Sequence, residues 1–258
     1  MCSHLIHQLP PPIIFGHRGA SKHAPENTMA AFEWAFKTGA PAVELDVMLS
    51  KEEEVVVIHD HKVDRTTDGQ GYVNQLTLQQ LKKLDAGSKF SEKFRGEKIP
   101  TLDEVLYLIS GDRLLNIELK NYHSIHDQLV SKVVEIVNKR GKTDSVIFSS
   151  FSWRNILKIR KFMPKAPAAL ITPGGILGKF EFSAFLRRIS PAFIHPDHQL
   201  VTERMIQYEH DNHRKINVWT VDAEEDMRWF FKAGIDGLMT NDPSLAVKTR
   251  IAAMNETG

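Results

Sequence analysis

The chain has 258 residues, of which 42% are hydrophobic and 25% are charged, and this composition is typical of a globular protein. Its 33 lysines and arginines nearly balance its 32 aspartates and glutamates, so the net charge of +1 argues against nucleic acid or an anionic membrane as the main partner. Cys2 is the only cysteine, which excludes an intrachain disulfide. Because no window approaches the ~20 apolar residues of a membrane span and the N-terminus lacks a signal-peptide pattern, we predict a cytoplasmic protein without a stable membrane anchor.

The first predicted elements follow a short N-terminal tail, residues 1–12. Ile13–Gly16 is an apolar run that predicts a strand, and the glycines around the end of this run allow a tight turn that leaves His17 at the strand's C-terminal end. A helix is predicted next, with Asn27 or Thr28 as its cap. Its buried stripe is predicted to be Met29, Phe32 and Phe36.

The connection between the next two apolar runs decides how they pair. Ala42–Val47 predicts one strand and Val55–His59 predicts another. A parallel crossover needs about a dozen residues or more, and the connection is shorter, so the second run must return antiparallel as a hairpin. The hairpin carries His59 back towards Asp46. We therefore interpret it as an insertion and not as a barrel strand.

From residue 61 to residue 100 the chain is polar and rich in turns, and it is long enough to form a small subdomain with a short helix near 77–84. Regular alternation of strands and helices then resumes. The further predicted strands are 114–119, 146–149, 168–171, 192–194, 216–221 and 237–240. The further predicted helices are 102–109, 125–139, 153–162, 182–189, 203–212, 224–233 and 244–253.

Apart from the hairpin, the predicted strands alternate with helices in the pattern of a parallel barrel. The sequence therefore predicts one domain, residues 1–258, with the α/β fold of a (β/α)₈ TIM barrel. The insertion, about residues 48–100, is predicted to lie over the C-terminal face of the barrel. An open doubly wound sheet is the alternative. It normally shows a glycine-rich dinucleotide fingerprint after its first strand, and Gly16-His17-Arg18-Gly19 is not one.

Three carboxylates are predicted to gather at the C-terminal ends of the strands. Glu44 and Asp46 are spaced i, i+2, so both point to one face of their strand, and Glu118 lies on a later strand. They would repel one another unless a cation lies between them, and oxygen ligands favour Mg²⁺ or Ca²⁺ over zinc. The alternative is that salt bridges to Arg18 and Lys120 neutralise the carboxylates without a metal.

His17 and His59 are the candidates for proton transfer, because an unperturbed imidazole titrates near ~6.5 and can both take and give a proton. The chain has 12 histidines, and a lone histidine is more often structural. These two are singled out because both lie at strand ends on the face that carries the carboxylates. We prefer His17 as the acid and His59 as the base, and the reverse assignment stays open.

Six segments of the chain together resemble the glycerophosphodiester phosphodiesterase family, whose members have a TIM-barrel fold. The segments cover nearly the whole chain in the expected order. They are His17-Arg18-Gly19, Pro25-Glu26-Asn27-Thr28, Glu44-Leu45-Asp46-Val47, His59-Asp60, Ile117-Glu118-Leu119-Lys120 and Trp219-Thr220-Val221. The resemblance implies a metal site at the three carboxylates and catalysis by the two histidines.

The resemblance also implies an activity. It is metal-dependent hydrolysis of a glycerophosphodiester, such as glycerophosphocholine or glycerophosphoethanolamine, to sn-glycerol 3-phosphate and an alcohol. Arg18 and Lys120 would then contact the phosphate, whose equatorial oxygens gather charge during the reaction. Phe151 and Trp219 would form an apolar wall against the glycerol carbons. The predicted partner is a small molecule, and the sequence leaves a monomer or a homodimer open.

Two departures and one unusual loop accompany this resemblance. Asp222 stands where the family commonly has asparagine, and Asn241 stands where aspartate is more usual. The loop 174–182 is unusually apolar, so it is either buried under a neighbouring helix or accepts the greasy group of a lysophospholipid. Lysophospholipid cleavage is therefore one alternative function. A non-catalytic phosphodiester-binding module is another, since a fold alone does not prove activity.

Overall fold

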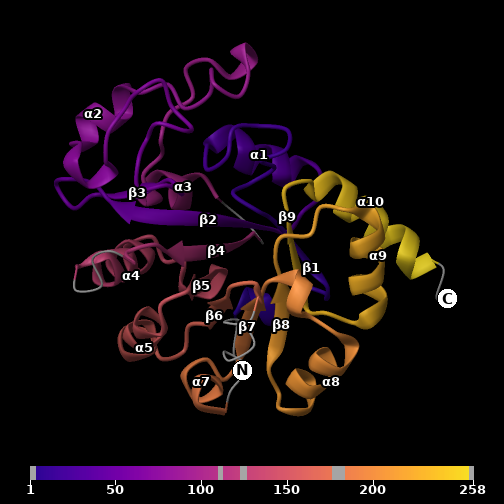
Figure 1. Ribbon diagram of the computed structural model, residues 1–258. Coiled ribbons are helices and arrows are strands. Elements are labelled where there is room, and N and C mark those ends of the chain that lie inside the picture. The colour runs from indigo at the N-terminus through magenta and orange to yellow at the C-terminus, as the bar shows by residue number, and fades with distance from the viewer. Residues whose placement is uncertain (1–3, 110–112, 123–126, 176–183, 256–258) are drawn as a thin grey trace.

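A closed barrel of parallel strands forms the centre of the molecule (Figure 1). This computed structural model describes residues 4–109, 113–122, 127–175 and 184–255. The barrel strands are β1 (Ile13–Gly16), β2 (Ala42–Leu49), β4 (Leu114–Leu119), β5 (Val146–Ser150), β6 (Ala168–Thr172), β7 (Phe193–Pro196), β8 (Lys215–Val218) and β9 (Gly237–Thr240). Because β1 pairs in parallel with both β2 and β9, the sheet closes on itself. The predicted TIM barrel is confirmed.

Helices cover the outside of the barrel (Figure 1). They are α1 (Met29–Lys37), α3 (Leu102–Leu108), α4 (Leu129–Lys139), α5 (Trp153–Phe162), α7 (Ala184–Ile189), α8 (Glu203–Asp211), α9 (Glu224–Ala233) and α10 (Pro243–Asn255). In α4, a stripe that includes Val130, Val133 and Val137 is fully buried, as expected for a helix that covers a sheet. Within the described ranges, no helix combines the length and the apolar character that a membrane crossing needs.

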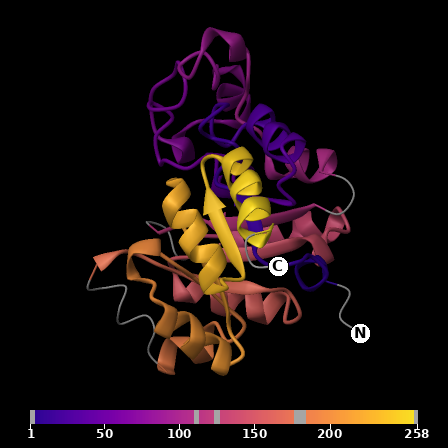
Figure 2. The ribbon, with the colours of Figure 1, turned by 90° about the vertical axis from the view of Figure 1, so that its right-hand side faces the viewer.

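The insertion begins where β2 runs beyond the barrel. The strand β3 (Val55–Val57) pairs antiparallel with the end of β2, so the predicted hairpin is confirmed. The insertion also contains α2 (Leu78–Lys83) and two short 3₁₀ turns, η2 (Val73–Gln75) and η3 (Glu92–Phe94). Its own apolar cluster includes Val63, Val73 and Leu81. In Figure 2 it projects from the barrel on the side away from α7 and α8.

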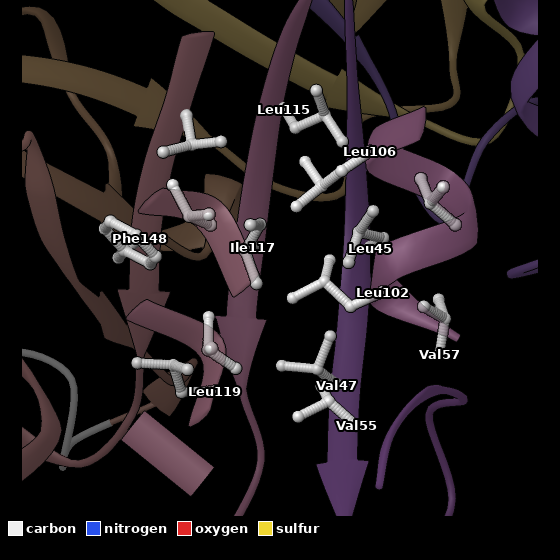
Figure 3. Close-up of a cluster of buried hydrophobic side chains, with 14 of the residues drawn as sticks. Leu45, Val47, Val55, Val57, Leu102, Leu106, Leu115, Ile117, Leu119 and Phe148 are labelled. Atoms are coloured by element: carbon white, nitrogen blue, oxygen red, sulfur yellow. The ribbon is translucent and has the colours of Figure 1, made fainter. Parts of the chain in front are cut away.

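Alternate residues of the barrel strands divide the apolar core into an outer and an inner part. The outer cluster packs the strands against the helices and includes Leu45, Ile117 and Phe148 (Figure 3). The inner cluster fills the barrel and includes Phe15, Ala42, Leu114, Ile147, Ala169, Phe193 and Met239. Two residues further along four of these strands, the inward positions turn polar. These positions are Glu44, Asn116, Ser149 and His195.

Several predicted details differ from the structure. The strand predicted at 216–221 ends at Val218, although Trp219 still forms an isolated parallel bridge with Asp197 and the Val221 N–H donates to the Met239 carbonyl at 2.9 Å. In α1 the cap is Thr28, whose hydroxyl accepts the N–H of Ala31, and Met29 and Phe36 are only half buried. The helix predicted at 125–139 is described from 129, and 125–126 lie outside the described residues. Residues 176–182 of the apolar loop also lie outside them.

Candidate active site

The three carboxylates meet at the C-terminal ends of β2 and β4. One oxygen from each of Glu44, Asp46 and Glu118 lies within 4.8 Å of the others, and all three side chains are buried. Parallel pairing of β2 with β4 puts Asp46 directly beside Glu118, which brings the two segments together. Burial, reinforced by the neighbouring carboxylates, raises the pKa of Glu44 well above its ordinary value, and burial and Asp46 raise the pKa of Glu118. The triad is therefore a concentrated negative charge.

Two cations border this triad. The Lys120 Nζ lies 3.2 Å from Glu118 Oε1 and 3.6 Å from Asp46 Oδ1. The Arg18 Nε lies 3.4 Å from Asp46 Oδ2, and the backbone N–H of Arg18 donates to Glu44 Oε2 at 2.9 Å. Burial works to raise the pKa of Asp46, but Lys120 and Arg18 hold it below its usual value. The predicted Lys120–Glu118 salt bridge is thus present, whereas the Arg18 guanidinium pairs with Asp46 and not with Glu44.

His17 follows β1 and lies beside the triad. Its Nε2 is 4.0 Å from Glu44 Oε2, and its Nδ1 is 2.8 Å from Asn241 Oδ1. Because an amide oxygen only accepts hydrogen bonds, Nδ1 carries the ring proton and Nε2 is left with a lone pair. Burial, and then the charge of Arg18, lower the pKa of His17 to about 4. The ring is therefore neutral near neutral pH.

The two departures from the family pattern meet at this histidine. The Asn241 Nδ2 donates to Asp222 Oδ2 at 2.6 Å, and the backbone N–H of Asn241 donates to Asp222 Oδ1 at 2.8 Å. These bonds orient the amide so that its oxygen faces His17. From the sequence, we expected Asn241 to affect only the closing turn. In the structure it contacts His17, a predicted site residue. This contact arises because β1 and β9 are neighbours where the barrel closes.

His59 lies just beyond β3 and has a charged partner. Its Nδ1 donates to Asp60 Oδ1 at 2.6 Å. The Arg65 guanidinium binds Asp60 Oδ2 at 2.6 Å and also pairs with Glu26, which in turn pairs with Arg18. The hydrogen bond from Arg65 holds the pKa of Asp60 well below its usual range. A chain of alternating charges therefore connects His59 to Arg18, and the two histidines have different partners, a carboxylate and an amide.

Sequence reasoning missed two residues that hold the carboxylates in place. The Asn27 Nδ2 donates to Asp46 Oδ2 at 2.8 Å, and the Tyr122 hydroxyl donates to Glu118 Oε1 at 2.7 Å. Asn27 has φ +57, a left-handed conformation that asparagine tolerates better than most residues. Its place in the Pro25-Glu26-Asn27-Thr28 segment was a usable signal. Tyr122 follows a strand in a loop and carried no such signal.

A cavity of about 160 Å³ joins these charged groups to an apolar wall. The wall consists of Phe151, Ile171, Trp219 and Met239. The ring of Phe151 packs edge-on against Trp219, with centroids 5.6 Å apart, and the Trp219 indole N–H donates to the His195 carbonyl at 2.9 Å. The structure thus brings the predicted aromatic residues, both histidines and both cations to one cavity beside the triad.

Comparison with known proteins decides the family. The profile of the "Glycerophosphoryl diester phosphodiesterase family" matches residues 17–245, which is most of the chain. The chain belongs to this family. The chain is similar to a glycerophosphodiester phosphodiesterase of Caldanaerobacter subterraneus subsp. tengcongensis. The two are 39% identical over 236 residues, which cover 91% of this chain and 96% of the relative.

Solved structures show the same fold. A phosphodiesterase of Oleispira antarctica, determined in complex with the product sn-glycerol-3-phosphate, has a TM-score of 0.86 and 28% identity and covers 97% of this chain and 99% of its own. A glycerophosphodiester phosphodiesterase of Thermotoga maritima has a TM-score of 0.74 and 30% identity, with coverage of 92% and 98%. This glycerophosphoryl diester phosphodiesterase family member is therefore an enzyme, and the alternative of a non-catalytic module is set aside.

The donor set of this phosphodiesterase family member fits a hard cation. Among the described residues, Glu44 Oε1 and Asp46 Oδ1 are buried oxygens without a hydrogen-bond partner. Burial, and then the charges of Asp46 and Glu118, raise the pKa of Glu44 even though Arg18 opposes the shift. Three carboxylates at this separation offer oxygen ligands only. The triad could therefore hold a metal ion.

Proposed function

We propose that the enzyme hydrolyses glycerophosphodiesters, such as glycerophosphocholine or glycerophosphoethanolamine, to sn-glycerol 3-phosphate and an alcohol. The observation that carries this proposal is the single cavity that joins a buried carboxylate triad, two cations and two histidines. Such a set of groups matches the needs of a phosphodiester, whose charge and leaving oxygen both require compensation. The names of the relatives and the product bound to the Oleispira antarctica enzyme support the same substrate class.

We propose one divalent cation, Mg²⁺ or Ca²⁺, as the cofactor held by Glu44, Asp46 and Glu118. When bound, such an ion polarises the phosphoryl oxygens and offsets the charge that develops on them. Asn27 and Tyr122 support the site, because their hydrogen bonds to Asp46 and Glu118 keep these carboxylates in one orientation.

Arg18 and Lys120 are proposed to hold the phosphate. Both line the cavity, and both are largely buried, so their charges are screened less than on an open surface. Their contacts with the triad fix them before substrate arrives. A cation held in place in this way stabilises the charge that grows on the phosphoryl oxygens during the reaction. Phe151 and Trp219 are proposed to pack against the glycerol carbons.

The partners of the two histidines favour the reverse of the sequence-based assignment. We infer that His17 takes the proton from the attacking oxygen, because its Nδ1 proton is held by an amide and its Nε2 lone pair is available. His59 is inferred to protonate the leaving alcohol, because the charged carboxylate of Asp60 stabilises the ring when it holds two protons. The attacking oxygen is either water or the neighbouring hydroxyl of glycerol, which would form a cyclic phosphate.

The proposal is tested by assaying glycerophosphocholine and lysophosphatidylcholine side by side, each with and without chelator. Choline release reports cleavage of either substrate, and release of sn-glycerol 3-phosphate identifies the bond that is broken in glycerophosphocholine. We expect rapid, chelator-sensitive formation of sn-glycerol 3-phosphate. Choline release from lysophosphatidylcholine alone would move the substrate class to lysophospholipids, and activity that resists exhaustive chelation would remove the metal from the proposal.

A further inference from the structure

Three neutral polar side chains lie inside the barrel next to its apolar filling, in the same inward layer as Glu44 of the acidic triad. They are Asn116 on β4, Ser149 on β5 and His195 on β7. Each is buried, with at most 1% of its surface exposed. Each follows an inward apolar residue by two positions, so its side chain points into the barrel. We refer to Asn116, Ser149 and His195 as the polar floor.

The hydrogen-bonding groups of the polar floor are largely unused. Neither the oxygen nor the nitrogen of the Asn116 amide has a hydrogen-bond partner among the described residues, and the same holds for the Ser149 hydroxyl and for His195 Nδ1. The other ring nitrogen, Nε2 of His195, accepts from Asn217 Nδ2 at 3.0 Å. The ring proton therefore lies on Nδ1, which is a donor. Buried polar groups in folded proteins are nearly always paired, so several unpaired groups in one layer call for a partner, which is either water or a ligand.

Two of the three residues of the polar floor line the cavity of the candidate active site. Asn116 and His195 both line it, together with Glu44, Glu118 and the apolar wall. Burial, and then the charge of Arg214, lower the pKa of His195 to about 3, so its ring stays neutral. The floor residues therefore offer uncharged donors and acceptors, whereas the charges of the cavity come from Arg18, Lys120 and the carboxylates. A neutral group that both donates and accepts, such as a hydroxyl, matches the floor, and a charged group would be costly to bury there.

The distance along β4 fits a short polyol. The Lys120 Nζ lies at the level of Glu118, at 3.2 Å from its carboxylate, and Asn116 is two residues deeper, or about 6.6 Å along the strand. A three-carbon alcohol esterified to a phosphate at Lys120 spans this depth. Its carbons would face Phe151 and Trp219, and its far end would reach the floor.

We propose that the polar floor binds the terminal hydroxyl of the glycerol group, the one farthest from phosphorus. His195 Nδ1–H donates to this hydroxyl, and the hydroxyl donates to the Asn116 amide oxygen, with Ser149 as a neighbouring polar group on β5. This inference rests on the proposed function. It makes Asn116 and His195 specificity-determining residues that recognise the glycerol group and not the phosphate.

The test compares glycerophosphocholine with an analogue in which the terminal hydroxyl is replaced by hydrogen and the hydroxyl next to the phosphate is kept. We expect wild type to prefer glycerophosphocholine in kcat/KM by at least about tenfold, because a site built around a hydroxyl rejects an analogue without it. Asn116→Leu and His195→Phe should each lower kcat/KM on glycerophosphocholine by about tenfold or more and change it little on the analogue. The preference should therefore fall towards one.

A matched control is Ile171→Val, which changes the volume of the same cavity without removing a hydrogen-bonding group. It should change kcat/KM on both substrates by the same factor. If Asn116→Leu or His195→Phe also lowered kcat/KM equally on both substrates, the floor would have only a structural role and the inference would be wrong. Equal rates of wild type on the two substrates would refute it as well, while failure of wild type on both would refute the proposed function instead.

Binding of the product provides a measurement that does not depend on folding of the variants. Titration calorimetry on the wild-type enzyme with its metal should show that sn-glycerol 3-phosphate binds at least about tenfold more tightly than the same molecule without its terminal hydroxyl. Equal affinity of wild type for the two ligands would overturn the inference.

Discussion

The two halves of the barrel contribute different chemistry to one cavity. Among the described lining residues, all the charged groups and both candidate proton-transfer histidines come from the half formed by β1, β2, β4 and the hairpin. The half formed by β5 to β9 contributes Phe151, Ile171, His195, Trp219 and Met239. The charged half is held by ion pairs and hydrogen bonds, as in Lys120 with Glu118. The other half is held by packing, as in Phe151 with Trp219.

This difference suggests a division of labour. A change in one of the charged groups or the two histidines of the first half should remove a step of the proposed chemistry, because each of them is proposed to have a distinct task. A change in the second half should alter how well the alcohol fits, because those residues offer shape and neutral contacts.

Removal of the metal should have the largest effect. Exhaustive chelation should abolish activity, and Mg²⁺ or Ca²⁺ should restore it, because the proposed ion at the triad offsets the charge that develops on the phosphoryl oxygens. Glu118→Gln should lower kcat/KM by about 1000-fold or more and weaken metal binding measured by calorimetry. Asp103→Asn, a change of the same kind on the exposed face of α3, is the control and should retain activity. Full activity in chelator of a triple variant with Glu44→Gln, Asp46→Asn and Glu118→Gln would rule out the metal site.

Removal of either histidine should have the next largest effect. His17→Ala and His59→Ala should each lower kcat/KM on glycerophosphocholine by about 100- to 10,000-fold. An aryl leaving group such as nitrophenolate needs no proton, so a glycerophosphodiester that carries it no longer needs the acid. We expect His59→Ala to recover most of its activity on the aryl substrate, and His17→Ala to remain impaired. Recovery of His17→Ala alone would restore the assignment predicted from the sequence.

Lys120→Met should lower kcat as well as raise KM, because the attraction between Lys120 and the phosphoryl group grows towards the transition state. The expected loss is on the order of 2–4 kcal/mol, or about 30- to 1000-fold in kcat/KM. Lys132→Met removes a lysine that pairs with Glu53 outside the cavity and serves as the matched control. Steady-state kinetics in which Lys120→Met matched this control would show that Lys120 only balances charge.

Trp219→Leu should have a smaller effect of another kind. It removes the ring that packs against Phe151 and faces the cavity, so KM should rise about tenfold while kcat changes little. Trp153→Leu, on the outer helix α5, should leave both constants unchanged. A fall in kcat of Trp219→Leu as large as that of Lys120→Met would contradict the division between the two halves.

Asn241→Asp should give the smallest effect at neutral pH and a clear effect in acid. A carboxylate behind Nδ1 of His17 favours the protonated ring and raises the pKa of His17 from its low value of about 4. Because the base must be unprotonated, the acidic limb of the profile of kcat/KM against pH should move to higher pH, by about one unit. Asn241→Asp places a second carboxylate beside Asp222. A double variant that also carries Asp222→Asn keeps a single carboxylate and removes the repulsion between the two. An unmoved acidic limb would argue against His17 as the base.

The barrel could be predicted because its evidence is local. Apolar runs, helix patterns and the short connection before Val55 are properties of neighbouring residues, and they led to the closed parallel sheet and to the antiparallel hairpin. The ends of the elements were less predictable. The regular strand predicted at 216–221 ends at Val218, and beyond it only an isolated bridge from Trp219 to Asp197 and one hydrogen bond from Val221 to Met239 remain, because pairing depends on where the neighbouring strands end.

The sequence alone was enough to predict the charged part of the candidate site, because Glu44, Asp46 and Glu118 are acidic residues within otherwise apolar strands, where carboxylates have few structural reasons to be. How these groups are held, and which neutral residues lie beside them, depends on the tertiary structure. Asn241 reaches His17 because the barrel closes between β1 and β9, and Asn27 reaches Asp46 across a turn. The polar floor depends on the inward faces of three strands, β4, β5 and β7. Neutral residues carry no charge signal in a sequence, so their role becomes visible only when distant strands are brought together and their hydrogen bonds can be counted.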